Sequence, residues 1–416
     1  MTLPRIALLV VSLDGRTHLD RLLESVDALD YPRDLLEVHV VDNGSSDGTV
    51  AWLRETRPSI RVIALPHNEG FAKPNNLAAQ AATDATYLAL VNNDMRLAPD
   101  WLHQALGGFV GEDVACVATR ILNWDGTRVD YVGSGRTFDG FGLQPDYGAD
   151  AARIQGTEGP VLFACGGAMM IRRSTFLALG GFDESFFAYF EDVDLGWRLW
   201  SSGHRVIYRP QAVSWHVHNG TSARFPSEAK RLLMERNALM MVLKNQEDED
   251  LLPHALAALL LTASRAALRG HVDEASFRME ELPVAPRLAA RQNVASRIAR
   301  VTRKRGLSGL ARAVSIKLLR DVLEHLEGGP TRVRGGSVLV SAEAWAGVLA
   351  LKDVASMLPE VMERRRQVQS WRKRPDRDLV GLMRHPLMVT EGGETYARLH
   401  EGLCRILGMR DRYDVQ

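Results

Sequence analysis

The sequence predicts an α/β fold in which a mostly parallel sheet is flanked by helices, followed by a largely α-helical C-terminal domain. Apolar runs of strand length alternate with segments of helical spacing up to about residue 225. Polar clusters directly follow several of these runs, and beyond residue 226 the apolar spacing is helical almost throughout. We therefore predict two domains, residues 1–225 and 226–416, each large enough to bury its own core.

The N-terminal domain is predicted to start with a buried strand at residues 6–11, followed by leucines at helical spacing. Further strand-length apolar runs cover residues 38–41, 62–65 and 87–91, and residues 72–82 have a helical pattern. Strands that alternate with helices in this way form parallel sheets covered on both faces. Ligands bind such sheets beyond the carboxyl ends of the strands, where the polar clusters of this sequence stand.

A Gly- and Asp-rich stretch at residues 123–160 interrupts this alternation and predicts a long loop, either functional or disordered. An apolar segment at residues 161–171 follows the loop. In the C-terminal domain, apolar residues at helical spacing predict amphipathic helices at residues 256–267, 317–326 and 348–361.

The composition is that of a soluble globular protein, with 46% hydrophobic and 25% charged residues. The first apolar run is only strand-length and does not indicate a signal peptide, and the longest apolar stretch of the second half is shorter than the roughly 20 residues of a membrane span. Three widely separated cysteines without ligand spacing argue against a disulfide framework or a cysteine metal site. We expect a cytoplasmic protein.

Asp42 ends a predicted strand and opens the polar turn at residues 42–48. A carboxylate in that position can accept hydrogen bonds from a nucleoside, and the small residues let the backbone approach a ligand closely. A turn in which Ser46 or Asp47 only caps the next helix explains the pattern equally well. The turn has neither the dinucleotide-binding fingerprint nor the Lys-Ser/Thr of a P-loop, which disfavours nicotinamide cofactors and ATP hydrolysis.

Asn92, Asn93 and Asp94 close the strand predicted at residues 87–91. A carboxylate among amides is a plausible hard ligand for Mg²⁺ or Mn²⁺, although a helix cap before Pro99 would also use it. One carboxylate does not hold a metal alone. His216 or His218, after a strand-like segment, is the candidate for the second ligand, against the commoner reading of a core histidine.

A third acidic cluster contains Glu191, Asp192 and Asp194 and lies among four aromatic residues between positions 186 and 190. Acids next to aromatic rings are candidates for partial burial and a raised pKa, which suits a general base. The alternative is a solvated helix N-terminus, where acids favour the helix dipole. The flanking aromatics favour the functional interpretation.

Taken in order, these motifs resemble the family 2 glycosyltransferases of the GT-A fold, especially the branch with rhamnosyl- and galactofuranosyltransferases. The resemblance covers about residues 4–225. It lies in the joint order of eight motifs, at residues 12–15, 42–49, 68–72, 92–94, 166–168, 180–184, 190–195 and 215–216.

The resemblance implies an inverting transfer of a sugar from a UDP- or dTDP-linked donor, with Mn²⁺ or Mg²⁺ as cofactor, in the synthesis of cell-envelope polysaccharide or glycolipid. Asp192 would be the base, with Glu191 beside it, and Asp94 and His216 would hold the metal. The family usually has Asn where this chain has Asp14. The nucleotide-sugar would be bound by Ser12, Asp14, Asp42, Asn43, Gly44, Asn68, Lys73, Asn93 and Gly167.

The formal net charge of zero hides an asymmetry, because residues 1–225 contain 19 Lys and Arg against 27 Asp and Glu, and the rest contains 32 against 24. Basic runs at residues 303–305, 364–366 and 372–374 make an anionic membrane surface, or a lipid-linked or saccharide acceptor, the candidate partner. A solvated helical face is the plainer explanation, and no nucleic acid is expected. The rival functions are a non-catalytic nucleotide-binding scaffold, a nucleotidyltransferase and a retaining transferase.

Overall fold

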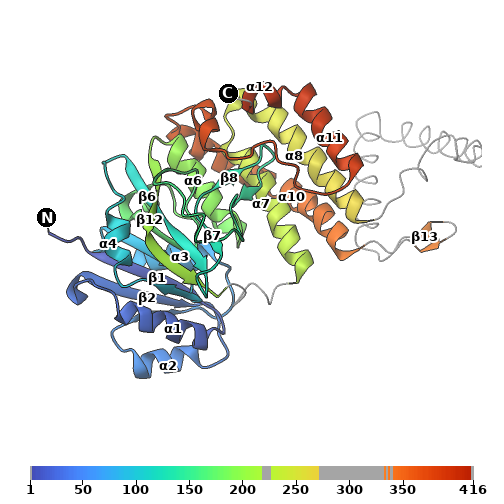
Figure 1. Ribbon diagram of the computed structural model, residues 1–416. Helices are drawn as coiled ribbons and strands as arrows, with labels where there is room; N and C mark the ends of the chain where they lie inside the picture. The colour runs from blue at the N-terminus through green and yellow to red at the C-terminus, as the bar shows by residue number, and fades with distance from the viewer. Residues whose placement is uncertain (1, 218–225, 271–331, 334–335, 338–340, 414–416) are drawn as a thin grey trace, which may run out of the picture. The chain divides into compact units, whose positions relative to one another are not determined.

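A computed structural model describes residues 2–217, 226–270, 332–333, 336–337 and 341–413. The chain forms two compact units, one made of Met1–Arg265 with Ala346–Gln416 and the other of Ala266–Trp345. Most of the second unit lies outside the described residues, so the first unit is the subject here (Figure 1).

The first unit contains a sheet with the strand order β10-β12-β6-β11-β4-β1-β2-β3, to which β5 and β7 add at β12 and β6. A separate two-stranded sheet pairs β8 with β9. The strands are β1 (Ile6–Ser12), β2 (Leu36–Asp42), β3 (Arg61–Ala64), β4 (Tyr87–Val91), β5 (Met95–Leu97), β6 (Val114–Asn123), β7 (Val129–Tyr131), β8 (Gly135–Arg136), β9 (Gly142–Leu143), β10 (Gly159–Pro160), β11 (Ala168–Arg172), β12 (Arg205–His216), and, in the second unit, β13 (Arg332–Val333) and β14 (Gly336–Ser337).

The direction of the strands brings the ends of six of them to one edge. Strands β4, β1, β2 and β3 are parallel, β6 is parallel to β12, and β11 runs antiparallel to both β4 and β6. The carboxyl ends of β1, β2, β4, β6 and β12 therefore share an edge with the first residues of β11. The sheet is mixed, and its parallel half contains the strands that the apolar runs predicted.

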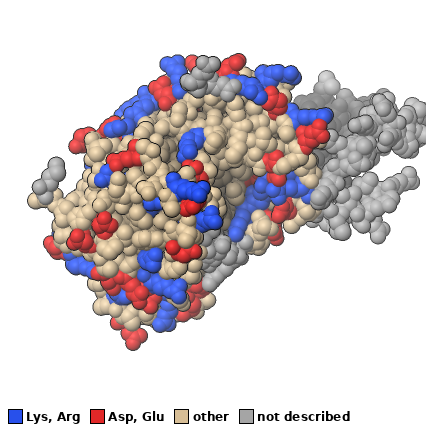
Figure 2. Space-filling model, in the orientation of Figure 1, with Lys and Arg blue, Asp and Glu red and all other residues tan. Residues whose placement is uncertain are grey.

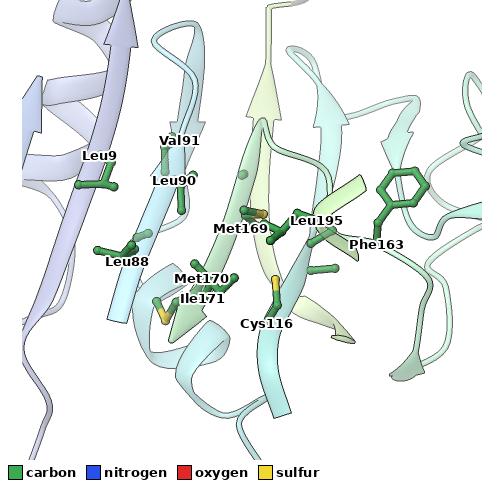
Figure 3. Packing of buried hydrophobic residues seen from close by; sticks show 14 of the residues in the cluster. Leu9, Leu88, Leu90, Val91, Cys116, Phe163, Met169, Met170, Ile171 and Leu195 are labelled. Atoms are coloured by element: carbon green, nitrogen blue, oxygen red, sulfur yellow. The ribbon is translucent and has the colours of Figure 1, made fainter. Parts of the chain in front are cut away.

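Helices cover the sheet through the side chains that the helical spacing had indicated. On α1 the buried residues are Leu19, Leu22, Leu23 and Val26. Figure 3 shows the interior between β1, β4, β11 and β6, where Leu9, Leu90 and Met169 are among the packed side chains. The helices of this part are α1 (Arg16–Asp27), α2 (Thr49–Thr56), α3 (Ala72–Ala81), α4 (Trp101–Leu106), α5 (Arg173–Ala178) and α6 (Glu191–Ser201), with short 3-10 turns η1 (Arg33–Leu35) and η2 (Glu184–Phe186).

The stretch at residues 123–160, for which a long loop was expected, is partly regular and much of it is buried. It contains four short strands, β7 to β10, and Tyr131 and Phe138 have no exposed surface. The backbone N–H of Phe138 donates to the carbonyl of Pro386, far along the chain. The disordered alternative is therefore wrong, because distant segments cover this stretch and local composition does not reveal them.

The C-terminal part is helical, as predicted, and the α/β fold class with a helical C-terminal region is confirmed. The expected helices at residues 256–267 and 348–361 lie within α8 and α10, whereas that at residues 317–326 falls outside the described residues. The domain boundary at residues 225/226 stays a prediction. The helices are α7 (Ser227–Asn245), α8 (Asp248–Arg269), α10 (Ala342–Trp371), α11 (Glu394–Ile406) and α12 (Met409–Tyr413), with the 3-10 segment η6 (Asp376–Leu382).

Buried ion pairs join these helices to α6 and to loops of the N-terminal part. Lys244 of α7 contacts Asp183 at 2.5 Å and Asp194 at 2.8 Å, and all three side chains are less than 5% exposed. Arg265 of α8 contacts Asp139 at 2.8 Å in an equally buried pair. Removing one partner of such a pair leaves a buried charge without compensation and typically costs about 3–5 kcal/mol.

The basic run at residues 364–374 makes internal contacts and is not a simple solvated face. Arg364 contacts Asp183 at 2.6 Å, and Arg365 donates to the carbonyls of Leu243 and Gln246. Arg374 donates to the carbonyls of residues 203 and 204. These guanidiniums tie α10 and the segment after it to the rest of the unit. The run at residues 303–305, like His218, lies outside the described residues.

One described helix, α8, is long and apolar enough to pass a length-and-composition test for a membrane span, with a mean hydropathy of 1.5. The sequence had given no such helix. A core helix passes the same test, and one side of α8 is buried, where His254 accepts or donates hydrogen bonds within the protein. The other side exposes Leu252, Leu256, Leu259 and Leu260.

Candidate active site

Two of the predicted nucleotide-binding residues lie side by side at the ends of β1 and β2. Ser12 is in register with Asp42, and the N–H of Asn43 donates to the carbonyl of Ser12 at 2.8 Å. Asp42 is 2% exposed; its Oδ1 accepts from the N–H of Ser45, and its Oδ2 has no hydrogen-bond partner among the described residues. A buried carboxylate oxygen that is left unsatisfied is costly, so it suits a ligand donor such as a ribose hydroxyl or a base N–H.

The turn after β2 is fastened to the loop after β1. Asp14 accepts from the N–H of Ser46 at 2.7 Å, and its own N–H donates to the hydroxyl of Ser45 at 2.8 Å. Gly44 has φ of +90°, and a Cβ there would lie 2.6 Å from the backbone of His67. The turn thus requires glycine at this position, whatever binds in front of it.

Asn43 connects the turn to the third predicted motif. Its Nδ2 donates to Asn68 Oδ1 at 2.9 Å and to the carbonyl of Gly70 at 2.7 Å, while its Oδ1 accepts from the N–H of Glu69. Lys73 contacts Glu69 at 3.0 Å and is 39% exposed. The predicted nucleotide-binding residues therefore form one connected group in which Lys73 lies at the margin.

Gly70 is required by a close approach to the segment before α6. Its φ is +83°, and a Cβ would lie 2.3 Å from the carbonyl oxygen of Phe187. Gly48 has a similar φ of +80° but nothing within 4 Å of the same position. We expect Gly70→Ala to lower the free energy of unfolding by about 1–3 kcal/mol more than Gly48→Ala, because both incur the left-handed strain and only the first forces backbone apart.

Urea unfolding of the two glycine variants and the wild type measures this difference. Equal losses for Gly70→Ala and Gly48→Ala would show that the Phe187 segment moves aside freely. The comparison therefore reports how firmly that segment is held.

The turn after β4 meets both the β1 end and the start of β11. Asn93 Nδ2 donates to the hydroxyl of Ser12 at 3.0 Å. The N–H of Asn92 donates to the carbonyl of Gly167 at 2.9 Å. The predicted nucleotide-binding residues, the Asn92–Asp94 turn and the Gly166–Gly167 turn therefore lie along one edge of the sheet, as expected from the positions of the motifs.

Asp94 and His216 face one another at this edge. His216 Nε2 lies 3.2 Å from Asp94 Oδ1, and Nδ1 lies 2.6 Å from Asp130 Oδ2. Burial alone would lower the pKa of His216, but hydrogen bonds to the two carboxylates raise that pKa to about 10. A metal ion at Nε2 would have to displace the proton held there. A carboxylate that fixes the other imidazole nitrogen is common at metal-bound histidines.

The spacing of this pair fits a divalent metal ion. Two adjacent ligands of an octahedral ion with bonds of about 2.1 Å lie about 3 Å apart, close to the 3.2 Å between Asp94 Oδ1 and His216 Nε2. Among the described residues no group of three or more His, Cys, Asp or Glu forms a metal cluster.

Asp192 and Glu191 begin α6 and differ in their hydrogen bonding. Asp192 accepts from the N–H of Gly166 at 2.9 Å and from that of Val193 at 2.8 Å. Burial raises the pKa of Asp192, and these two N–H donors oppose the rise. Burial and the Asp192 charge raise the pKa of Glu191 well above its usual range, and its Oε2 has no hydrogen-bond partner in the described part of the chain. Burial therefore favours the neutral form of Glu191 most strongly, whereas the two N–H donors favour the anionic form of Asp192, as the prediction of Asp192 as the base requires.

The remaining acids of this cluster have structural partners. Asp194 Oδ2 accepts from Arg198 at 2.8 Å, and Asp194 Oδ1 accepts from Asn245 at 2.7 Å. Burial opposes ionisation of Asp183, but Lys244 and Arg364 hold the pKa of that carboxyl well below its usual range. Both acids anchor the start of α6 and the turn before it to C-terminal helices.

Two contributors to this edge carried no signal in the sequence. Asp130 lies in the Gly- and Asp-rich stretch, 86 residues from the histidine that it orients. Asn237 of α7 has no exposed surface and contacts the aromatic segment before α6. Both lie outside the motif order, and only an alignment of relatives or the fold itself could single them out.

Comparisons with known proteins agree with this geometry. Residues 10–180 match the family model described as Glycosyl transferase family 2. Over 233 residues the chain is 28% identical to an N-acetylglucosaminyl-diphospho-decaprenol L-rhamnosyltransferase of Mycobacterium tuberculosis, an alignment that covers 50% of this chain and 75% of that protein.

Two further relatives are matched over a smaller share of their length. A Pre-mycofactocin glycosyltransferase of Mycobacterium tuberculosis is 32% identical, with 44% of this chain and 38% of that protein covered. The O-antigen biosynthesis protein RfbC of Myxococcus xanthus is 30% identical, with 78% of this chain and 24% of that protein covered. Among solved structures, S. aureus TarS 1-349 in complex with UDP-GlcNAc has a TM-score of 0.46 at 17% identity, over 65% of this chain and 76% of that one.

Proposed function

We propose that this glycosyltransferase moves a sugar from a UDP- or dTDP-linked donor to an acceptor hydroxyl, with inversion at the anomeric carbon. The proposal starts from the match of residues 10–180 to the family 2 glycosyltransferase model. The observation that carries the proposal is the convergence of three groups at one sheet edge. These are the unsatisfied oxygen of Asp42, the Asp94–His216 pair and the Asp192 carboxylate beside Gly166.

The donor would lie along the edge from β2 to β11. The nucleoside would meet Asp42 and the connected turns around Ser12, Asp14 and Asn43, and the diphosphate would lie toward Asp94. Gly167 has no side chain to obstruct the sugar, and a Cβ there would meet only ordinary van der Waals contacts in the structure. Gly44, Asn68 and Asn93 would support this surface through the hydrogen bonds and close approaches described above.

Asp94 Oδ1 and His216 Nε2 would hold Mn²⁺ or Mg²⁺, and Asp130 would keep the imidazole oriented. The ion, when bound, stabilises the negative charge that develops on the departing diphosphate. Asp192 takes the proton of the acceptor hydroxyl, whose oxygen forms the new bond to the anomeric carbon as the bond to the diphosphate breaks. A displacement from the opposite face inverts that carbon.

The acceptor would be a saccharide or a lipid-linked saccharide of cell-envelope polysaccharide or glycolipid synthesis, at the cytoplasmic face of a membrane. The relative from Mycobacterium tuberculosis is named for a diphospho-decaprenol acceptor. The exposed leucines at positions 252, 256, 259 and 260 of α8 would suit docking at a membrane interface. Figure 2 shows Lys and Arg side chains along a hollow on the face presented. Co-sedimentation with vesicles tests this, and no preference for anionic over neutral lipid would count against it.

Thermal unfolding with nucleoside diphosphates tests the catalytic assignment. With Mn²⁺ present, we expect either UDP or dTDP at 100 times its dissociation constant to stabilise the protein by about 2.7 kcal/mol, and GDP to have little effect. If no nucleotide raises the melting temperature, the assignment is contradicted and a scaffold without donor binding becomes the better account.

A further inference from the structure

We propose that Asn237 of α7 is a positioning residue for the base, because it holds the backbone that delivers Asp192 to the active-site edge. The inference rests on the proposed function. It concerns a residue beyond the family match at residues 10–180 and assigns a role to the helical C-terminal part.

The backbone just before α6 is in an unfavourable conformation. Phe187, Tyr189 and Phe190 have φ of 63°, 71° and 67°, so three non-glycine residues within four positions are left-handed. Each such residue costs on the order of 1–3 kcal/mol and persists only where its surroundings hold it. Asp192 follows two residues after Phe190, so its place depends directly on this segment.

Asn237 holds the segment from one side. Its Nδ2 lies 3.0 Å from the carbonyl of Phe186, 2.8 Å from that of Ala188 and 2.7 Å from that of Tyr189. The two N–H bonds of one amide are thus shared among three carbonyls. Arg236 adds bonds at 3.0 and 2.9 Å to the carbonyls of residues 185 and 186, and its Nε donates to Asn237 Oδ1.

The opposite side of the segment is held by the start of α3. The carbonyl of Phe187 accepts from the N–H of Phe71 at 2.6 Å, and the missing side chain of Gly70 permits that approach. The segment is therefore fixed between the loop that carries donor-binding residues and a helix of the C-terminal part. Losing the amide of Asn237 removes the hydrogen bonds from α7 to the carbonyls of Ala188 and Tyr189 and leaves only those of Arg236 to residues 185 and 186.

The rest of α6 is held by other contacts, so a change at Asn237 can move Asp192 without unfolding the helix. Asp194 is bound by Arg198, Lys244 and Asn245, none of which contacts the carbonyls that Asn237 holds. Without Asn237 we expect α6 to stay in place and the strained segment to relax. A misplacement of about 1 Å at a catalytic group can cost about 10²-fold in rate.

Asn237→Asp tests this, because it keeps the side-chain volume and replaces the donating N–H₂ with an oxygen that repels three carbonyls. Asn237→Ala removes the group altogether. Thr262→Val is the matched control, since Thr262 is also buried and its hydroxyl donates to Glu235 of α7 and accepts from Arg265 of its own helix, without touching the segment. Measured for each variant are kcat for transfer, nucleotide affinity with Mn²⁺, melting temperature and hydrogen exchange.

In both Asn237 variants we expect kcat to fall about 10- to 100-fold with nucleotide affinity unchanged, and exchange at residues 185–192 to rise while the rest of α6 stays protected. Thr262→Val should lower the melting temperature and leave kcat unchanged. Unchanged exchange at residues 185–192, or a kcat that follows melting temperature as in Thr262→Val, overturns the inference. Absence of transfer in the wild type would instead refute the proposed function, and the exchange measurement would still decide the role of Asn237.

Discussion

Asp192→Asn is expected to lower the rate of sugar transfer by about 10²–10⁴-fold and to leave nucleotide binding intact. The amide oxygen of an asparagine can still accept from the N–H groups of Gly166 and Val193, so the start of α6 should keep its shape. What is lost is the capacity to take the acceptor proton. Initial rates with the donor that stabilises the protein, compared with the nucleotide affinity of the same variant, measure the two effects separately.

The neighbouring carboxyl provides the matched control. Burial and the Asp192 charge raise the pKa of Glu191 well above its usual range, which favours its neutral form, and glutamine is a neutral side chain of the same shape. Glu191→Gln should therefore retain most of the activity. If Glu191→Gln is the inactive variant and Asp192→Asn is active, the base has been assigned to the wrong residue of the pair.

The same pair predicts the pH dependence of transfer. A base must be deprotonated, so kcat/KM should fall as pH decreases through the pKa of Asp192 in the free enzyme. Burial raises that pKa, which places the acid limb above the ordinary aspartate value of about 3.9. An acid limb at or below that ordinary value would contradict the environment described for Asp192.

Local pattern predicted the parallel half of the sheet and the residues at its edge because both depend on short segments. An apolar run such as that of β1 is buried on both faces of the sheet. The polar residues that follow such runs, among them Asp42 and Asp94, therefore lie where the strands end. A topological rule then brings those ends together. The motif at residues 166–168 reaches the same edge because β11 runs antiparallel and begins there, and the motif at residues 190–195 meets it through the hydrogen bond from Gly166 to Asp192.

Local sequence pattern could not predict the contacts between segments that are distant in the chain. Asp130 meets His216 across 86 residues, and Asn237 meets the segment before α6 across about 50. Three arginines of the basic run at residues 364–374 resemble part of a charged surface in the sequence, yet Arg364 contacts the buried Asp183, and Arg365 and Arg374 donate to backbone carbonyls elsewhere in the chain. Charge patterning reports the composition of a helix face and does not report what that face packs against.

Asp94→Ala is expected to abolish the metal-dependent part of nucleotide binding and to lower transfer about 10²–10³-fold. The variant removes one of the two proposed protein ligands of the metal. Stabilisation of the leaving diphosphate by a metal is worth several kcal/mol, at about 1.4 kcal/mol per tenfold in rate. Thermal shifts with the stabilising nucleotide should depend on Mn²⁺ in the wild type and not in Asp94→Ala. Melting temperatures without nucleotide give the baseline for both proteins.

Asp130→Asn should weaken metal binding less than Asp94→Ala does, because Asp130 orients His216 through Nδ1 and does not face Nε2. Loss of such an outer carboxylate typically weakens metal affinity about 10–100-fold, so higher Mn²⁺ concentrations should restore nucleotide stabilisation in Asp130→Asn and not in Asp94→Ala. If the wild type binds nucleotide equally strongly in the presence of a chelator, the proposed role of the metal is contradicted. If Asp130→Asn needs no more Mn²⁺ than the wild type for nucleotide stabilisation, Asp130 does not support metal binding through His216.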